Sequence, residues 1–294
     1  AMGEGGEPWV NGASMNNQGV EFTVSFKSDP SSEFQWAVSA NIGTYKTELT
    51  DLPSNVINKY AGDGVHDLIL GRSPNSAYGL VADGIFKTQE EVDAHADQPG
   101  KAVGRIRYKD LDGDGVINET YDRTWIGCYD PDFFGGLNFD FAYKGFDLNL
   151  FFEGMFGNDV NSDWKKESDI WLFTNPAWKN HATRMLGGWS PDNPNSDIPA
   201  ISNNTANQEQ RFSSWFIEDG SYIKLRNIEL GYTFPTKLIK KMHMSNLRLY
   251  AAAYNVFTLK KFWGDDKYTS FDPERPSYHY LTPFTFNFGI NVSF

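Results

Sequence analysis

The sequence predicts an all-β protein, with about seven antiparallel strands that form part of a large transmembrane β-barrel with long extracellular loops. Apolar and polar residues alternate with period two over segments about as long as a membrane-crossing strand, whereas helical periodicity is scarce. The connections between these segments are alternately short and long. Outer-membrane barrels combine both features, because their strands face lipid and lumen in turn and their periplasmic turns are short.

The first two predicted strands are residues 20–27 and 34–42. The apolar face of the first carries Val20, Phe22, Val24 and Phe26, and that of the second carries Phe34, Trp36, Val38, Ala40 and Ile42. The residues between them on each strand are mainly polar, as expected for a sheet with two different faces. Residues 29–32 form a short connection.

The third and fourth strands are predicted at residues 137–144 and 146–153. Their apolar residues are Leu137, Phe139, Phe141 and Tyr143, followed by Phe146, Leu148, Leu150 and Phe152. Lys144 and Gly145 lie between the two runs and predict a tight turn.

The last three strands are predicted at residues 221–234, 246–258 and 283–294. Alternation is weaker in the second of these and strongest in the last, PFTFNFGINVSF, whose polar face is small and uncharged. Residues 235–245 connect the first two, and TKLIKKMH after Pro235 predicts a short helix.

The remaining connections are long, namely residues 49–134, 158–220 and 259–282. Since outer-membrane barrels have their long loops outside the cell, we predict that these three segments are extracellular. A soluble β-sandwich also shows period-two alternation and many aromatic residues. The loop asymmetry and the polar faces opposite aromatic ones on nearly every strand count against it.

Seven strands cannot close a pore. An open sheet in lipid would leave unpaired N–H and C=O groups at both edges, each costing several kcal/mol. We therefore expect the rest of the barrel to come from the same polypeptide or from a companion chain.

Composition excludes other classes. The 294 residues carry a net charge of -12 without a long basic cluster, which argues against nucleic-acid binding. No stretch approaches the roughly 18 to 20 apolar residues of a membrane-spanning helix. The five histidines are isolated and no Gly-x-Ser-x-Gly motif occurs, so we expect no enzyme activity.

Several motifs in a fixed order resemble the C-terminal barrel portion of the SusC/RagA family of TonB-dependent outer-membrane transporters. They include GRIRYKDLDGDGVIN at residues 104–118, the run at 122–159, FIEDGSYIKLRNIELGYTF within 216–259, the aspartate-rich 261–274 and the closing 283–294. The resemblance covers nearly the whole chain.

The resemblance implies a barrel of about 22 strands with a plugged lumen in the bacterial outer membrane. It also implies import of oligosaccharides or peptides, a SusD-like surface lipoprotein as a lid, and energy from TonB acting on the plug. No plug domain or TonB box occurs in this sequence, so the energy-coupling residues of the family cannot be placed here.

The DLDGDG run has the spacing of a calcium loop. Asp110, Asp112, Asp114, the Val116 carbonyl and Asn118 stand at positions 1, 3, 5, 7 and 9. Position 12 is Tyr121 instead of an acid, so Glu119 or Asp122 would have to replace it. An acidic, solvated turn has the same sequence; if a cation binds, calcium suits an all-protein cage better than magnesium.

Five of the nine tryptophans lie in or beside the 158–220 connection: Trp164, Trp171, Trp178, Trp189 and Trp215. Exposed aromatic rings can stack on sugars or contact the lid. A loop of this length also needs a small core of its own, and tryptophans would serve that purpose equally well.

The acidic residues 265, 266, 272 and 274 in the last long connection have two interpretations, a cation or partner site and a solvated loop tip.

Aromatic residues near predicted strand ends indicate the girdles that meet lipid headgroups. They are Tyr232, Phe234, Tyr250, Phe257 and Phe294.

The alternative hypothesis for the whole chain is a secreted, calcium-dependent carbohydrate-binding β-sandwich.

Overall fold

The computed structural model describes residues 12–54, 56–57, 60–64, 66–170, 181–202, 206–260, 269–276 and 280–294. The chain divides into two compact units. Unit 1 comprises Ala1–Gln18, Lys46–Asp130 and Ser168–Ile217, and unit 2 comprises Gly19–Tyr45, Pro131–Glu167 and Glu218–Phe294. Among the described residues, no helix has the length and hydropathy needed to span a membrane.

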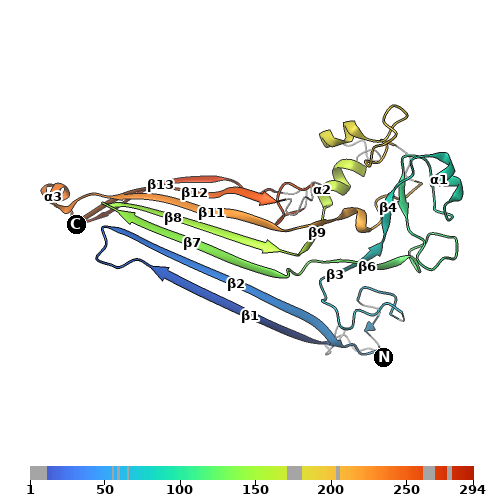
Figure 1. Ribbon diagram of the computed structural model, residues 1–294, viewed down its shortest axis with the longest axis horizontal. Coiled ribbons are helices and arrows are strands. Elements are labelled where there is room, and N and C mark those ends of the chain that lie inside the picture. The colour runs from blue at the N-terminus through green and yellow to red at the C-terminus, as the bar shows by residue number, and fades with distance from the viewer. Residues whose placement is uncertain are drawn as a thin grey trace, which may run out of the picture. The chain divides into compact units, whose positions relative to one another are not determined.

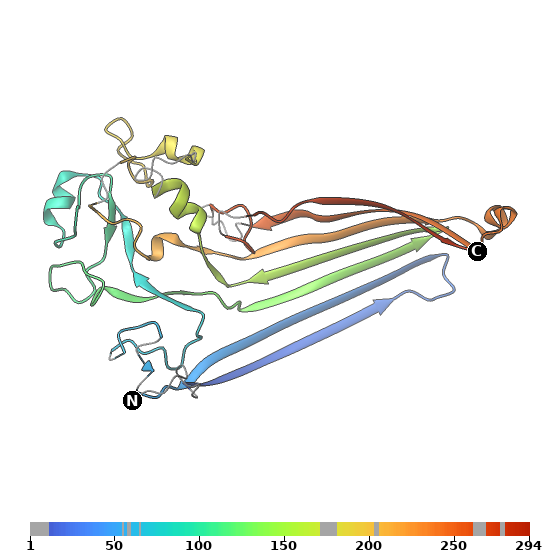
Figure 2. The same cartoon turned by 180° about the vertical axis from the view of Figure 1, so that it is seen from behind.

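Seven long strands form one sheet in the order β1-β2-β7-β8-β11-β12-β13 (Figure 1). Their bounds are β1 Ser14–Lys27, β2 Phe34–Asp51, β7 Phe133–Tyr143, β8 Phe146–Phe156, β11 Tyr222–Thr233, β12 Asn246–Lys260 and β13 Thr285–Ser293. Every neighbouring pair from β2 to β13 is antiparallel. The predicted seven-stranded antiparallel sheet is therefore confirmed, and Figure 2 shows it from behind, with β1 and β13 at its two edges.

The strand register separates the two faces that the alternation predicted. Asn149 lies opposite Asp140 on β7 and Glu229 on β11. Its neighbour Leu148 lies opposite Phe141 and Leu230. Polar residues thus share one face and apolar residues the other, because side chains alternate along every strand.

A β-bulge in β11 interrupts the alternation. Leu225 pairs with Phe152 of β8 and Asn227 with the adjacent Phe151, so Arg226 is the extra residue. On the other side, β12 accommodates the irregularity with Asn255 in the left-handed region at φ 54°. This bulge explains why the pattern in residues 221–234 holds only after Arg226.

The connections agree closely with the predicted boundaries. The turn at Lys144 and Gly145 joins β7 to β8, and both residues have positive φ. The predicted helix after Pro235 is present as α3, Thr236–Ile239, continued by a 3-10 turn at Lys240–Met242. The long connections contain short elements of their own.

Most of those elements belong to unit 1. They are β3 Ser76–Leu80, β4 Ala82–Ile85, α1 Gln89–Ala94, β5 Ile106–Tyr108, β6 Arg123–Cys128 and the 3-10 turns Thr183–Gly187 and Ser214–Phe216. In addition, β9 Asp159–Asn161 pairs with β10 Ile217–Asp219, and α2 Asp163–Lys165 continues into a π-helical turn at Lys166–Ile170. The described residues contain no second large sheet to face the first, since every other sheet has two strands. The sandwich alternative is therefore wrong for this fold.

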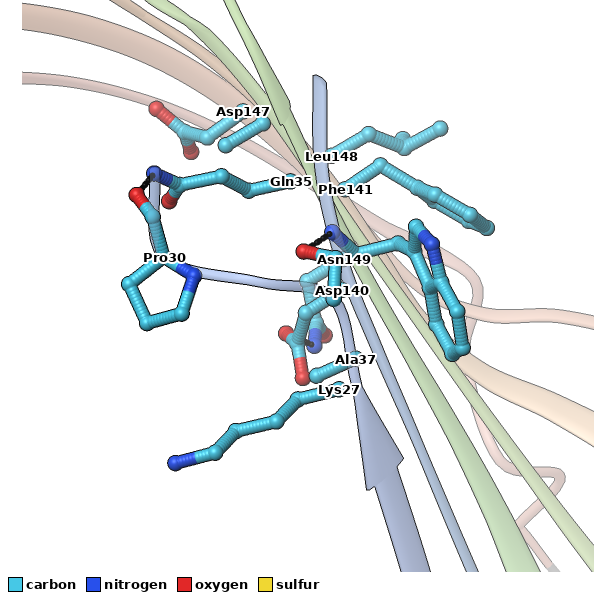
Figure 3. A pocket seen from close by; sticks show the side chains of 12 residues that line it. Lys27, Pro30, Gln35, Ala37, Asp140, Phe141, Asp147, Leu148 and Asn149 are labelled. Carbon is cyan, nitrogen blue, oxygen red and sulfur yellow. Dashed lines mark hydrogen bonds between the residues drawn. The ribbon is translucent and has the colours of Figure 1, made fainter. Parts of the chain in front are cut away.

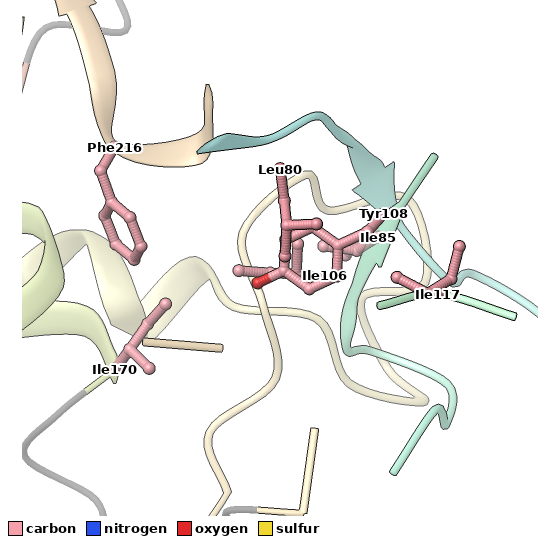
Figure 4. Close-up of a cluster of buried hydrophobic side chains, with 7 residues drawn as sticks. All are labelled: Leu80, Ile85, Ile106, Tyr108, Ile117, Ile170 and Phe216. Atoms are coloured by element: carbon pink, nitrogen blue, oxygen red, sulfur yellow. The ribbon is translucent and has the colours of Figure 1, made fainter. Parts of the chain in front are cut away.

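Unit 1 has its own hydrophobic core, drawn in Figure 4. Its buried residues are Leu80, Ile85, Ile106, Tyr108, Ile117, Ile170 and Phe216. A buried polar cluster lies beside them, in which Arg105 pairs with Glu209 at 2.9 Å. Burial raises the pKa of Glu209, although the charge of Arg105 opposes that shift.

Candidate functional site

The polar face of the sheet carries a ladder of amides and one carboxylate at its centre. The Asn149 side-chain amide donates to Asn138 at 3.0 Å and to Asp140 at 2.7 Å, and Asn227 donates to Asn149 at 2.8 Å. These groups come from β7, β8 and β11, whose register places them side by side. A surface of this kind offers hydrogen bonds to polar molecules without a net positive charge.

A hollow of about 350 Å³ lies where the β1–β2 hairpin meets β7 and β8 (Figure 3). Lys27, Gln35, Asp140 and Asp147 contribute its charged and amide groups. The Gln35 side chain donates to the Pro30 carbonyl at 2.9 Å, which fixes the turn. The hollow therefore lies beside the amide ladder, with the hydrogen-bonded β1–β2 turn at its rim.

Arg248 forms a second charged group on the polar face. Its Nε donates to Asp147 at 3.0 Å and its guanidinium to Glu229 at 2.7 Å. The guanidinium also lies 5.1 Å from the centre of the Tyr250 ring. The expectation that Tyr250 belongs to the apolar girdle is wrong, because it pairs across the strands with Gly289 and its ring covers that glycine on the polar face.

A network of five charged residues joins the sheet to residues 269–276. Lys224 contacts Asp272 at 3.2 Å and also pairs with Glu274. Arg226 pairs with Glu274 and with Glu153 at 2.8 Å. Only 2% of the Lys224 side chain is exposed, so these carboxylates replace water as its polar partners.

The bulge at Arg226 makes this network possible. Lys224 points to the polar face by strand alternation, and the extra residue lets Arg226 reach carboxylates on the same side. Asp272 and Glu274 are therefore ion-pair partners of β11. The interpretation of these two residues as a solvated loop tip is wrong. Residues 265 and 266 lie outside the described residues. Sequence reasoning missed Lys224 and Arg226, although two basic residues within a strand were a visible signal.

The DLDGDG loop is ordered by its own carboxylates. Asp110 accepts the backbone N–H groups of Gly113 at 2.7 Å and Gly115 at 2.8 Å. The buried Asp122 accepts those of Leu111 and Asn118 at 2.8 and 2.7 Å. Both glycines have positive φ, which the tight turn requires.

Three carboxylates of this loop come together. One oxygen each of Asp110, Asp112 and Asp122 lies within 4.8 Å of the others, whereas Asp114 and Glu119 are not in that group. Asp122 thus takes the place considered for position 12. The Asn118 side-chain oxygen is occupied instead by the backbone N–H groups of Thr120 and Tyr121.

The pKa values of Asp110 and Asp112 shift in opposite directions because of these contacts. The backbone N–H of Gly115 is the main cause of the lowered pKa of Asp110. The pKa of Asp112 is raised, because desolvation and the charges of Asp114 and Asp122 together outweigh the bond from the Asp114 backbone N–H. A carboxylate repelled by its neighbours in this way would be stabilised by a cation.

The described tryptophans pack against other residues. Trp189 and Trp215 lie half-buried against the core of unit 1, and Trp189 covers Gly104. Trp164 packs edge-on against Phe271, with ring centres 4.6 Å apart. This packing supports the small-core interpretation for Trp189 and Trp215. Trp171 and Trp178 lie outside the described residues, and contact with cargo or a lid stays a prediction.

Aromatic rings gather on the apolar face at both ends of the strands. At the short-turn end, Tyr232 packs against Phe146 at 4.6 Å and Phe234 at 5.0 Å. At the other end, Phe257 lies 6.5 Å from Phe152. Phe294 is 90% exposed at the end of the last strand. The ten-residue rise from Phe146 to Phe156 is about 33 Å along the strand, which at the usual tilt matches an apolar band of about 25 Å.

No family model matches the sequence. The chain is 30% identical over 95% of its length to TonB-dependent receptor P3 of Formosa agariphila. It is 26% identical over 97% of its length to the TonB-dependent receptor SusC of Bacteroides thetaiotaomicron. It spans only 29% and 27% of these two relatives.

Solved structures give the same result for the fold. The RagAB peptide transporter matches 97% of the chain with a TM-score of 0.72 and 22% identity, and the chain covers 30% of it. The RagAB peptide importer in the closed-closed state gives a TM-score of 0.69 at 22% identity. The predicted origin of the sheet as part of a large barrel wall is confirmed.

Proposed function

Because the chain belongs to the SusC/RagA family of TonB-dependent outer-membrane transporters, we propose that it forms part of the wall and extracellular mouth of a nutrient importer. The observation that carries this proposal is the two-faced sheet, apolar with aromatic ends on one side and lined by amides and ion pairs on the other. Such a wall meets lipid outside and polar cargo inside.

The cargo is an oligosaccharide or a peptide, and its entry is energised by TonB through the plug of the complete receptor. The amide ladder supports both cargo classes, since amides and carboxylates bond to hydroxyl and peptide groups alike. A SusD-like lipoprotein is the proposed lid. Unit 1, with a core of its own, supplies an ordered surface on which such a lid can close.

We expect a strain that lacks the complete receptor to lose uptake of a labelled oligosaccharide pool or a labelled peptide pool, and a strain without TonB to lose the same uptake. Measuring both pools in parallel identifies the cargo class. The control is the deletion strain complemented with the intact gene. Unchanged uptake of both pools after deletion would contradict the import proposal.

Calcium binding by the DLDGDG loop is a second part of the proposal. The three converging carboxylates of Asp110, Asp112 and Asp122 are hard oxygen ligands of the kind that calcium prefers. The ion would hold the loop in one conformation at the surface of unit 1.

We expect Asp112→Asn in the complete receptor to weaken terbium or calcium binding by about tenfold or more, since site affinity depends on ligand charge. Asp114→Asn is the matched control, because Asp114 is outside the group of three. Terbium luminescence with calcium competition measures both variants. Equal loss in the two variants, or no luminescence in the unaltered protein, would refute the site.

A further inference from the structure

A hollow of about 490 Å³ opens on the apolar face of the sheet, toward the ends of β7 and β8 that lead into the long connections. Gly135 and Gly154 lie opposite each other across these strands and form its floor. Ile42 pairs with Gly135 and Ile223 with Gly154, which places an aliphatic side chain on each flank. The two facing glycines let neighbouring groups come close to the strands, since a Cβ on Gly154 would meet the Phe156 ring at 3.1 Å and one on Gly135 would meet the Asn41 carbonyl oxygen.

Aromatic rings close the two ends of this hollow. Phe133 and Phe156 stack with ring centres 4.9 Å apart at the end near the long connections. Phe139 and Phe152 meet edge to face at 6.2 Å at the other end. The result is an apolar trough bounded by an aromatic pair at each end.

An acidic hollow of about 320 Å³ shares the Phe133 and Phe156 pair with the trough. Its other lining includes Asp132, Asp159 and Asp219, and no lysine or arginine is among the described residues that line it. Apolar and acidic hollows therefore adjoin at one aromatic pair.

We propose that the two hollows bind one membrane lipid, with an acyl chain in the trough and an amine-bearing headgroup at the three carboxylates. This rests on the proposed function only in placing the apolar face in the membrane. The carboxylates select for the amine, because a headgroup with phosphate as its only charge would be repelled.

The floor of the trough favours a hydrocarbon chain over a peptide. β7 is paired on both sides by β2 and β8, and β8 by β7 and β11, so the ladder already uses the backbone groups of Gly135 and Gly154. An added peptide segment would leave its own N–H and C=O groups unsatisfied in lipid, whereas an acyl chain has none.

The test uses the complete receptor in nanodiscs of equal parts phosphatidylethanolamine and phosphatidylglycerol, extracted again into mild detergent. Native mass spectrometry counts the lipid that remains bound. Leu137→Trp, which fills the trough, is expected to lower retention by at least about tenfold, the effect of losing contact with about two methylene groups. Leu230→Trp on the same face is the matched control, because Leu230 does not line the trough. Equal retention in both variants would overturn the lipid site.

The headgroup has its own variant, outside the long strands. Unaltered receptor is expected to retain phosphatidylethanolamine in excess over phosphatidylglycerol, and the double variant Asp132→Asn, Asp219→Asn is expected to abolish that excess. An excess that is absent in the unaltered protein, or unchanged in the variant, would overturn the headgroup assignment. This variant also keeps the proposal testable if Leu137→Trp fails to assemble.

Cargo uptake is measured separately on the same variants. Lipid retention without uptake in the unaltered receptor would refute the import function and leave the lipid site intact. Uptake by the unaltered receptor, with equal lipid retention in Leu137→Trp and Leu230→Trp, would refute the lipid site and leave the import function intact.

Discussion

Lys224→Met in the complete receptor is expected to destabilise the end of the sheet next to residues 269–276 by about 3 to 5 kcal/mol, the cost of removing one partner from a buried ion pair. Lys224 is almost fully buried and neutralises Asp272 and Glu274. Without it, Asp272 loses the ion pair that attaches it to β11, whereas Glu274 keeps its contacts with Arg226 and Tyr222. Thermal unfolding and limited proteolysis within residues 269–276 measure the two effects.

The control for this prediction is Lys27→Met on β1, where the lysine is exposed. Its effect should stay within about 0.5 kcal/mol, as for most surface substitutions. Equal melting temperatures for the two variants would show that the network does not hold the segment.

Neutralising Lys224 together with its two carboxylate partners provides a sharper test. In Lys224→Met combined with Asp272→Asn and Glu274→Gln, no uncompensated carboxylate remains around position 224. Much of the lost stability should therefore return, since replacing a buried ion pair completely is often nearly neutral. If the triple variant is less stable than Lys224→Met alone, the cost does not arise from unpaired charge.

The sheet could be predicted from the sequence because each strand must present an apolar face to lipid. That requirement repeats every second residue and is visible without any tertiary contact. The bulge at Arg226 could not be predicted, since an inserted residue shows only as a break in the pattern. Tyr250 was assigned to the girdle because it lies near a strand end. Its neighbour Leu249 lies on the apolar face opposite Tyr232, so strand alternation puts Tyr250 on the polar face.

The sites were less predictable because they depend on chain segments that meet only in the fold. Loop spacing identified Asp110 and Asp112, but Asp122 joins them through a turn that encloses Asn118. Nothing local to β11 indicated that Lys224 would be covered by residues some fifty positions later. Trp189 and Trp215 had three interpretations in the sequence, and only packing favours one of them.

Leu150→Arg is expected to cost about 2 to 4 kcal/mol and to reduce assembly of the complete receptor in the outer membrane, because position 150 lies near the middle of β8 on the apolar face. Leu150 pairs with Phe139 and Ile228, so an arginine there would point into hydrocarbon. Assembly is measured as the fraction of receptor that resists unfolding in unheated detergent gels.

Asn149→Arg is the matched control, since it places the same charge one residue away on the polar face. There the arginine replaces an amide beside Asp140 and Glu229, two carboxylates that can pair with it. The guanidinium can donate to Asp140 and Glu229 in place of two of the three hydrogen bonds of the Asn149 amide, so the net cost should be about 1 kcal/mol. Comparing the two variants tests which face meets lipid. A soluble protein exposes both positions to water and tolerates both arginines, whereas a membrane barrel tolerates Asn149→Arg and not Leu150→Arg. Equal assembly of the two variants would therefore contradict the membrane orientation on which the import proposal depends.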